Sequence, residues 1–288
     1  MAAIAVVFLD LYLMALRTSL LFRSQAMPLP VATALRLTLV SSWFALFSPG
    51  AAGGDIAKVF YATREARGRR AEITVILLLD RAIGLLSLLL LPLLMVPFFW
   101  SALEGARQLR ELLAFTAGVA GVALLAFLAC LYSDPLSEAL GRGGDRPDRR
   151  PERLLRALAT LRSYRKHPGT LLLSLLIALC DNCLVVVLAA LALLALRPSV
   201  LSSKLALVVP LGTVANSLPL TPGGLGVGEA AFNKVFALAG LSLGAEALVC
   251  TRIWRAIAAI PGLFLYLRGV GPITFDREGP GRDSSDLP

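Results

Sequence analysis

Two short stretches of the chain place an acidic residue directly after glycines, with an arginine 23 to 26 residues further on. They are Asp55 after Gly53 and Gly54, followed by Arg81, and Glu229 after the segment GLGVG (224–228), followed by Arg252. A guanidinium group binds a phosphate through two parallel hydrogen bonds. The amide groups at the start of a helix also attract anions. The repeated pattern therefore indicates a site for an anionic headgroup.

Charged residues inside apolar segments need a partner or a function, because each costs at least about 2.5 kcal/mol near the centre of a membrane helix. Two interpretations stay open. In the first, the charges are structural ion pairs, Asp55 or Asp80 with Arg81, and likewise Glu229 with Arg252. In the second, they line a substrate site. The two are compatible, because a paired arginine can exchange its partner for a phosphate. The candidate substrate-binding residues are Asp55, Asp80, Arg81, Glu229, Arg252 and Arg255.

The elements that must hold these charges are membrane-spanning helices. Of the 288 residues, 57% are hydrophobic and only 16% are charged, against about 25% charged in ordinary soluble domains. Apolar stretches of at least about 18 residues predict spanning helices. The sequence contains five of them, at 2–22, 73–97, 111–132, 169–196 and 246–267. The fourth stretch is interrupted near its middle by two consecutive polar residues, Asp181 and Asn182.

Two further apolar segments, 32–60 and 205–240, are interrupted by proline and glycine, which bend or end a helix. We expect each to enter and leave the membrane on the same side, as a re-entrant hairpin. Paired interruptions of this kind are typical of inverted-repeat transporters. The predicted fold is an all-α integral membrane protein with about five transmembrane helices plus two broken, re-entrant segments in an inverted repeat. The predicted structural helix breaks are Pro49, Gly53, Gly54, Pro219, Pro222, Gly223, Gly224, Gly226 and Gly228.

The net charge of +9 lies in loops, where basic residues set the orientation and face anionic lipids. Because 55–72 and 133–168 are rich in Lys and Arg, we expect both on the cytoplasmic side. The predicted organisation is a first membrane half (1–132), a cytoplasmic basic linker (133–168), a second membrane half (169–268) and a disordered tail (269–288). The N-terminus lacks the basic region and cleavage site of a secretory signal peptide.

Signatures of other functions are weak. Basic and aromatic residues do not interleave, so we expect no nucleic-acid partner. The sequence has no GxSxG, HExxH or P-loop motif, and its one histidine, His167, lies at the edge of a loop. Cys180 and Cys183 form a CxxC inside an apolar segment, without the four ligands of a closed zinc site. We therefore predict no enzymatic activity, no metal and no cofactor.

Three stretches, SPGAAGGDIAKVFY (48–61), LLLDRAIGLLSL (77–88) and NSLPLTPGGLGVGEAAF (216–232), resemble the lysylphosphatidylglycerol synthase transmembrane region family, also called flippase-like domain proteins. The resemblance implies a multi-pass protein of the bacterial or archaeal cytoplasmic (inner) membrane. It also implies re-entrant helices around a central cavity through which an aminoacylated phospholipid moves between leaflets. The positions that match the family signature are Gly53, Gly54, Asp55, Asp80, Arg81, Pro222, Gly223, Gly224, Gly228 and Glu229.

Three departures from the family limit what carries over. We expect no further N-terminal span, and Lys58 matches only loosely the basic position after GGD. No soluble C-terminal domain that transfers an aminoacyl group is expected either, so synthesis of the lipid is not implied. The leading hypothesis is a translocase for an anionic or aminoacylated phospholipid, or for a polyprenyl-linked lipid. The alternative is a non-transporting membrane partner of a lipid- or glycolipid-synthesising enzyme. A homo-oligomer stays open.

Overall fold

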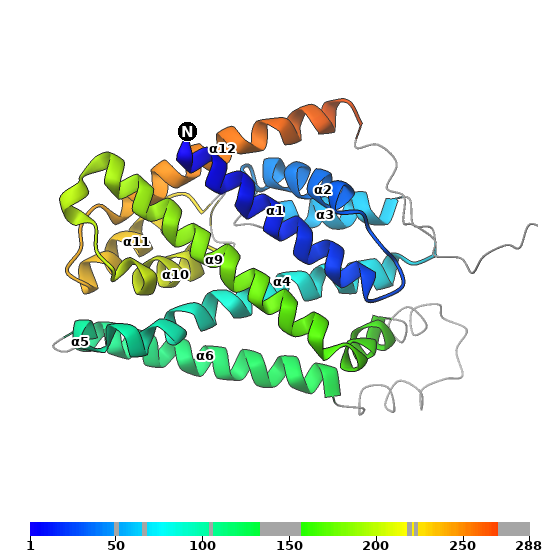
Figure 1. Cartoon of the computed structure of the whole chain (residues 1–288), viewed down its shortest axis with the longest axis horizontal. Coiled ribbons are helices and arrows are strands. Elements are labelled where there is room, and N and C mark those ends of the chain that lie inside the picture. Colours follow the sequence, from blue (N-terminus) through cyan, green and yellow to red (C-terminus); the bar gives the residue numbers. More distant parts are fainter. Residues whose placement is uncertain are drawn as a thin grey trace, which may run out of the picture.

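The computed structural model describes residues 1–48, 52–64, 68–103, 106–132, 157–217, 221 and 224–269. Within these residues the chain forms helices and no strand, as expected for an all-α membrane protein (Figure 1). The helices lie along one long axis, and most of their apolar side chains face outward or pack between helices. This arrangement suits a bilayer, in which each helix satisfies its own backbone hydrogen bonds.

Five helices are long and apolar enough to cross a membrane. They are α1 (Ala2–Arg23), α4 (Arg70–Met95, continued by the 3-10 turn η1, Val96–Phe99), α6 (Arg107–Tyr132), α9 (Pro168–Leu196) and α12 (Gly244–Leu267). Each coincides with one of the five predicted spans to within a few residues. The hydropathy pattern was sufficient because about 20 apolar residues are needed to cross the hydrocarbon core.

Both interrupted segments are helical hairpins. The first is α2 (Val31–Ala45) and α3 (Ala52–Arg64), and the second is α10 (Leu205–Asn216) and α11 (Val227–Leu238). Each of these helices has 12 to 15 residues, so it is only about 18 to 22 Å long and too short to cross alone. The prediction that the segments are broken is confirmed. Re-entrant insertion and the inverted repeat stay predictions.

The predicted helix breaks divide into three groups. Gly224 and Gly226 lie in the turn before α11, as expected. Gly53, Gly54 and Gly228 lie instead within the first turn of α3 or α11, so they do not themselves interrupt a helix. They allow close packing there: a Cβ on Gly54 would lie 2.7 Å from the carbonyl oxygen of Ser41 on α2. Pro49, Pro219, Pro222 and Gly223 lie outside the described residues.

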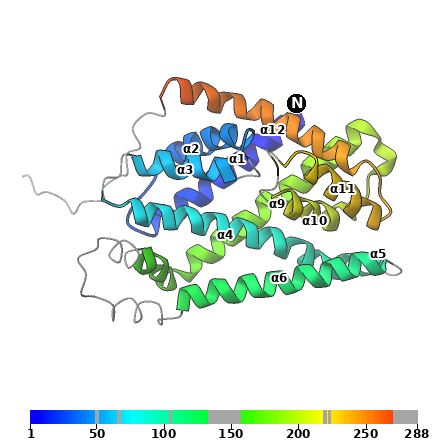
Figure 2. The same cartoon turned by 180° about the vertical axis from the view of Figure 1, so that it is seen from behind.

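The two hairpins pack in corresponding ways. Helix α1 packs against α9 in the middle of the bundle, and α6 packs along α4 at one edge (Figures 1 and 2). Helix α2 packs against α12, and α10 packs against α4, so the first helix of each hairpin contacts a span far away in the sequence. The second helices, α3 and α11, pack against the spans that follow them, α4 and α12. The second helix of each hairpin can therefore contact the side chains of the span that follows it.

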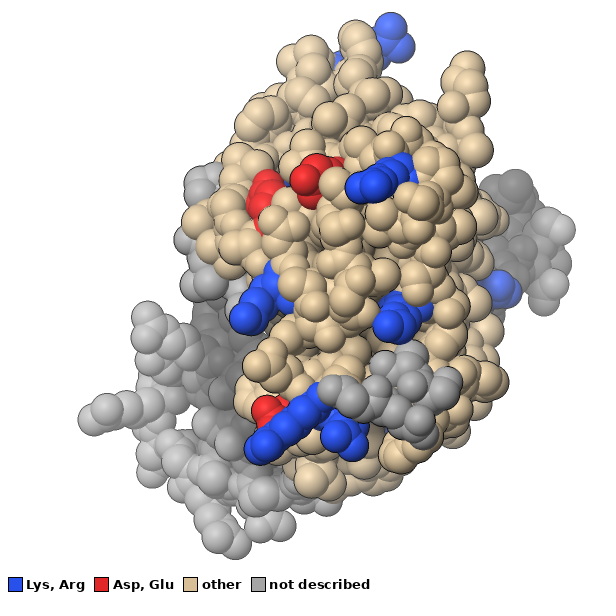
Figure 3. All heavy atoms as spheres, turned by 90° about the vertical axis from the view of Figure 1, so that its left-hand side faces the viewer, with Lys and Arg blue, Asp and Glu red and all other residues tan. Residues whose placement is uncertain are grey.

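Charged side chains are few on the surface at the end of the bundle where α10 and α11 lie. Figure 3 shows this end, with Lys, Arg, Asp and Glu side chains scattered over a mostly uncharged surface.

Part of the basic linker packs against the first span. Residues 157–163 of the linker are helical and are followed by the 3-10 turn η2 (Tyr164–Lys166). The Tyr164 hydroxyl donates a 2.8 Å hydrogen bond to the carbonyl oxygen of Leu21. Burial raises the pKa of Tyr164, so this donor stays protonated.

Candidate functional site

The start of α11 forms a compact polar site around Glu229. Gly226 precedes the helix with φ = 81°, a conformation that favours glycine. Its amide donates a 2.8 Å hydrogen bond to Oε2 of Glu229, so the carboxylate caps its own helix. The other carboxylate oxygen, Oε1, accepts a hydrogen bond from Nη1 of Arg252 on α12. The predicted pairing of Glu229 with Arg252 is therefore present.

Arg252 is held by the turn as well as by the acid. Its Nη2 atom donates to Oδ1 of Asn216 at 2.7 Å and to the carbonyl oxygen of Gly224 at 2.8 Å. A Cβ on Gly228 would collide with Oδ1 of Asn216 and lie 2.6 Å from Nη2 of Arg252. The glycine there leaves room for the guanidinium. The Arg252 and Glu229 side chains are 19% and 20% exposed, which makes this a largely closed site.

The corresponding pair in the first hairpin is looser. Asp55 lies in the first turn of α3, and Nε of Arg81 on α4 approaches its Oδ2 at 3.3 Å. The Arg81 side chain is 33% exposed and that of Asp55 is 44% exposed. The predicted pairing is again present, but this arginine stays accessible from outside the bundle.

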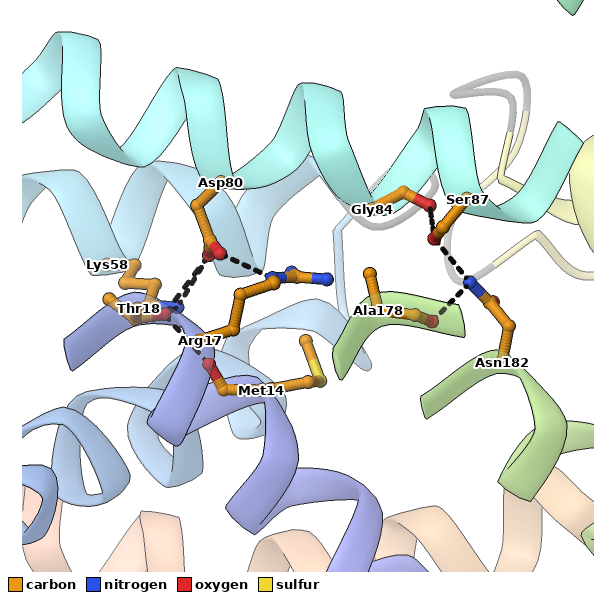
Figure 4. Close-up of polar contacts among 9 residues, drawn as sticks. All are labelled: Met14, Arg17, Thr18, Lys58, Asp80, Gly84, Ser87, Ala178 and Asn182. Carbon is orange, nitrogen blue, oxygen red and sulfur yellow. Dashed lines mark hydrogen bonds and ion pairs between the residues drawn. The ribbon is translucent and has the colours of Figure 1, made fainter. Parts of the chain in front are cut away.

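Asp80 does not join Arg81, although the two are consecutive. Consecutive helical residues point about 100° apart, and Asp80 faces the interior between α1 and α3. There its Oδ1 accepts a 2.6 Å hydrogen bond from Nε of Arg17, and its Oδ2 accepts from Thr18 at 3.1 Å and Lys58 at 3.3 Å (Figure 4). The alternative pairing of Asp80 with Arg81 is thus wrong. A separate buried network takes its place.

This buried network ties three helices together. Arg17, Lys58 and Asp80 are 4%, 6% and 5% exposed, respectively. Lys58 also donates a 2.8 Å hydrogen bond to the Thr18 hydroxyl, which closes the network between α1, α3 and α4 (Figure 4). A short distance along α4, the Ser87 hydroxyl accepts a 2.7 Å hydrogen bond from Asn182 on α9. Because one acid serves two bases, the network carries a net positive charge.

Arg255 belongs to a fourth group. Its Nη2 atom lies 3.3 Å from the carboxylate of Asp10 on α1, and Asp10 is 2% exposed. Arg255 comes one turn after Arg252 on α12 but pairs with a different helix. The six predicted substrate-binding residues therefore lie in four groups rather than one: Asp55 with Arg81, Glu229 with Arg252, Asp80 with Arg17 and Lys58, and Arg255 with Asp10.

Sequence reasoning missed Asp10, Arg17 and Asn216 as functional candidates and gave Lys58 only a loose family match. A signal for two of them was present. Asp10 and Arg17 are charges inside the first apolar segment, seven residues apart and so on one helical face. Asn216 carried no such signal, because an asparagine at a helix end is common. Among the described residues, no group of three or more His, Cys, Asp and Glu side chains could hold a metal ion.

Comparison with protein families gives one match. The family described as "Lysylphosphatidylglycerol synthase TM region" matches residues 1–265. Comparison with curated proteins and with solved structures gave no significant match. The matched range covers four of the five spans in full, α12 as far as residue 265, both hairpins and the four charged groups described above. The chain is therefore a multi-pass membrane protein that belongs to the lysylphosphatidylglycerol synthase TM region family.

Proposed function

We propose that the protein moves a phospholipid or a lipid-linked headgroup between the two leaflets of its membrane, without an enzymatic step. The observation that supports this most is the Asp55–Arg81 pair, whose side chains are 44% and 33% exposed. Large apolar side chains of the same two helices, among them Ile56 and Leu78, are exposed as well. Charges in such a position are costly, and a structural ion pair would be better buried. Accessibility is what a headgroup site needs.

Arg81 is the residue that we expect to receive the headgroup phosphate. It has one carboxylate neighbour at 3.3 Å, so a phosphate can replace Asp55 at little cost. A guanidinium then offers two parallel donors to the phosphate oxygens. The released Asp55 carboxylate is close by and suits the ammonium group of an amine-bearing or aminoacylated headgroup. The acyl chains stay in the bilayer, and the polar contacts replace the water that the headgroup loses.

Arg252 has a different expected role. Glu229, Asn216 and the Gly224 carbonyl already accept three of its five N–H donors, including both on Nη2, so a phosphate that binds both Nη atoms requires the turn before α11 to open. We propose that this second site is closed in the present conformation and becomes available only after a movement of α11 relative to α12. The central polar cavity between the two hairpins is part of this proposal.

The test is reconstitution of the purified protein in liposomes that carry a fluorescent phospholipid in one leaflet. Loss of asymmetry should be faster than in protein-free liposomes. Arg81→Ala should slow it roughly tenfold, equivalent to about 1.4 kcal/mol. The matched control is Arg107→Ala, which removes an arginine whose side chain is 84% exposed and pairs with Glu111 at the start of α6. Equal rates for the wild type and Arg81→Ala contradict the role of Arg81. Wild-type rates equal to those of empty liposomes contradict transport and favour a non-transporting partner of a lipid-synthesising enzyme.

A further inference from the structure

Arg17 is a buried cation that uses only part of its hydrogen-bonding capacity. Its side chain is 5% exposed, and its Nε atom donates to Oδ1 of Asp80 at 2.6 Å. Among the described residues, neither Nη atom of Arg17 has a hydrogen-bond acceptor. A guanidinium group has five N–H donors, four of them on its two Nη atoms. Because a buried polar group without a partner is costly, the end of this side chain indicates a place for an acceptor.

No acid in contact with Arg17 fully balances its charge. Lys58 also pairs with Asp80, so one carboxylate serves two bases. Of the other acids on α1 and α9, Asp10 pairs with an arginine of α12, and Asp181 forms no ion pair with Arg17 in the part of the chain that the structure describes. The two Nη atoms therefore combine unused donors with a positive charge, and an anion is their natural complement.

Gly84 on α4 leaves these Nη atoms without a covering side chain. In Figure 4 the end of Arg17 extends past Asp80 toward Gly84. A Cβ on Gly84 would lie 3.3 Å from both Nη atoms of Arg17. Gly84 is partly exposed, whereas Asp80 and Ser87 on the same face of α4 are buried. At this position, α4 thus presents only backbone to the guanidinium.

The same glycine lies between the buried Arg17 and the accessible Arg81. Because successive helical residues are about 100° apart, Gly84 is about 40° around α4 from Asp80 and about 60° from Arg81. It is therefore positioned between the face that holds Arg17 and the face that carries Arg81. The residues of α4 from Asp80 to Gly84 place no other side chain between the two arginines. A group bound at Arg81 thus has a glycine, rather than a side chain, on its way to the Nη atoms.

We propose that Arg17 is a second phosphate-binding residue, which a ligand reaches from Arg81 across Gly84. The ligand is a phosphate group, either that of a lipid headgroup or a free phosphate ion, and it accepts hydrogen bonds from both Nη atoms. Asp80 keeps its own bond to Nε, so the guanidinium stays oriented when the phosphate binds. The transfer from Arg81 rests on the proposed lipid movement, whereas phosphate binding by Arg17 does not.

The charge of the buried network favours one of these two sources. Arg17 and Lys58 carry two positive charges and Asp80 carries one negative charge. A phosphate group with a single negative charge makes this network neutral, and a phospholipid supplies such a group as its phosphodiester. The doubly charged form of free phosphate leaves an excess negative charge, which is costly in the interior. We therefore expect the lipid to bind more tightly than the free ion.

Calorimetric titration of the full chain, purified in an uncharged detergent without phosphate, tests the site. The titrants are inorganic phosphate and, separately, phosphatidylglycerol in mixed micelles. Arg81→Ala removes the outer site and should still bind phosphatidylglycerol. Adding Arg17→Lys keeps a positive charge beside Asp80 but removes the paired donors, so binding should weaken about tenfold. Binding of inorganic phosphate alone overturns the lipid as the source, and binding of neither titrant overturns the site.

Gly84→Ala tests the same site without removing a charge. Its methyl group lies against both Nη atoms of Arg17, so phosphatidylglycerol should bind several-fold more weakly, again in the Arg81→Ala background. The matched control is Gly118→Ala on α6, where nothing lies within 4 Å of the Cβ position. If binding is unchanged in either Gly84→Ala or Arg17→Lys, the proposal is overturned.

The liposome assay separates this site from the proposed function. With Arg81 present, Gly84→Ala should slow the movement of the reporter phospholipid, although Asp55 and Arg81 are intact. Movement that is as fast in Gly84→Ala as in the wild type overturns the passage across Gly84 and leaves the proposed function intact. Phosphatidylglycerol binding that depends on Arg17, in a protein that moves no lipid, supports the site and contradicts the proposed function.

Discussion

The two hairpin sites have the same acid–arginine pairing but differ in how exposed the paired side chains are. In each, an acid in the first turn of the second hairpin helix pairs with an arginine on the following span. At α3, Asp55 and Arg81 meet at 3.3 Å and are 44% and 33% exposed. At α11, Arg252 binds Glu229, Asn216 and the Gly224 carbonyl, and both charged side chains are about 20% exposed. The pairing repeats, but only the first site is open.

The difference follows from where the hairpin turns place their polar groups. Arg252 donates hydrogen bonds to the Gly224 carbonyl in the turn before α11 and to the Asn216 side chain at the end of α10, and the glycines there allow the approach. At the first hairpin, the additional polar contacts belong to Asp80 instead, which faces Arg17 and Lys58 in the interior. The buried network joins α3 to α1 and α4, and Arg81 lies outside it with Asp55 as its ion-pair partner.

The largest loss of stability is expected from Asp80→Ala. The substitution leaves Arg17 and Lys58 buried without an ionic partner, which costs about 3 to 5 kcal/mol for a broken buried pair. The melting temperature in detergent and the yield of monodisperse protein measure the effect. Asp55→Ala is the matched control and should lose much less, because Arg81 is a third exposed. Equal losses for the two variants would show that the first hairpin has no separate buried network.

An intermediate effect is expected from Arg252→Lys. An ammonium group cannot reach Glu229, Asn216 and the Gly224 carbonyl with the fixed fork of a guanidinium, so we expect a loss of about 2 kcal/mol. Arg81→Lys keeps its one ion pair and should leave the melting temperature nearly unchanged. Both are measured as thermal unfolding in the same detergent. If Arg81→Lys destabilises as much as Arg252→Lys, the two sites are equally closed in solution.

A smaller effect is expected from Gly228→Ala. The added methyl group meets Asn216 and Arg252, and such overpacking costs about 1 to 3 kcal/mol. Gly121→Ala on α6 is the matched control, since nothing lies within 4 Å of its Cβ position and alanine favours the helix. The midpoint temperature of thermal unfolding should fall in Gly228→Ala and rise in Gly121→Ala. A stabilised Gly228→Ala would contradict the tight contact between α11 and Arg252.

Much of the architecture could be predicted because it depends on local properties of the chain. The spans follow from apolar length, and the interruptions follow from Pro and Gly. The two acid–arginine pairs were also predicted, since each acid lies at a helix start and each arginine lies on the next span. The partners of Asp80 and Arg255 could not be, because Arg17 and Asp10 come from α1, and no local pattern states which helix faces which.

The sequence by itself determined that this is a membrane protein and where its five spans lie, and it predicted which charged residues are candidates for an anionic-headgroup site. The tertiary structure decided which of those residues are exposed and which are buried, and it paired Asp80 with Arg17 and Arg255 with Asp10. The physical reason is that hydropathy and helix-breaking residues act over one or two turns. A charge in an apolar helix, by contrast, finds its partner only when distant helices pack, and that packing depends on the shape of every intervening side chain.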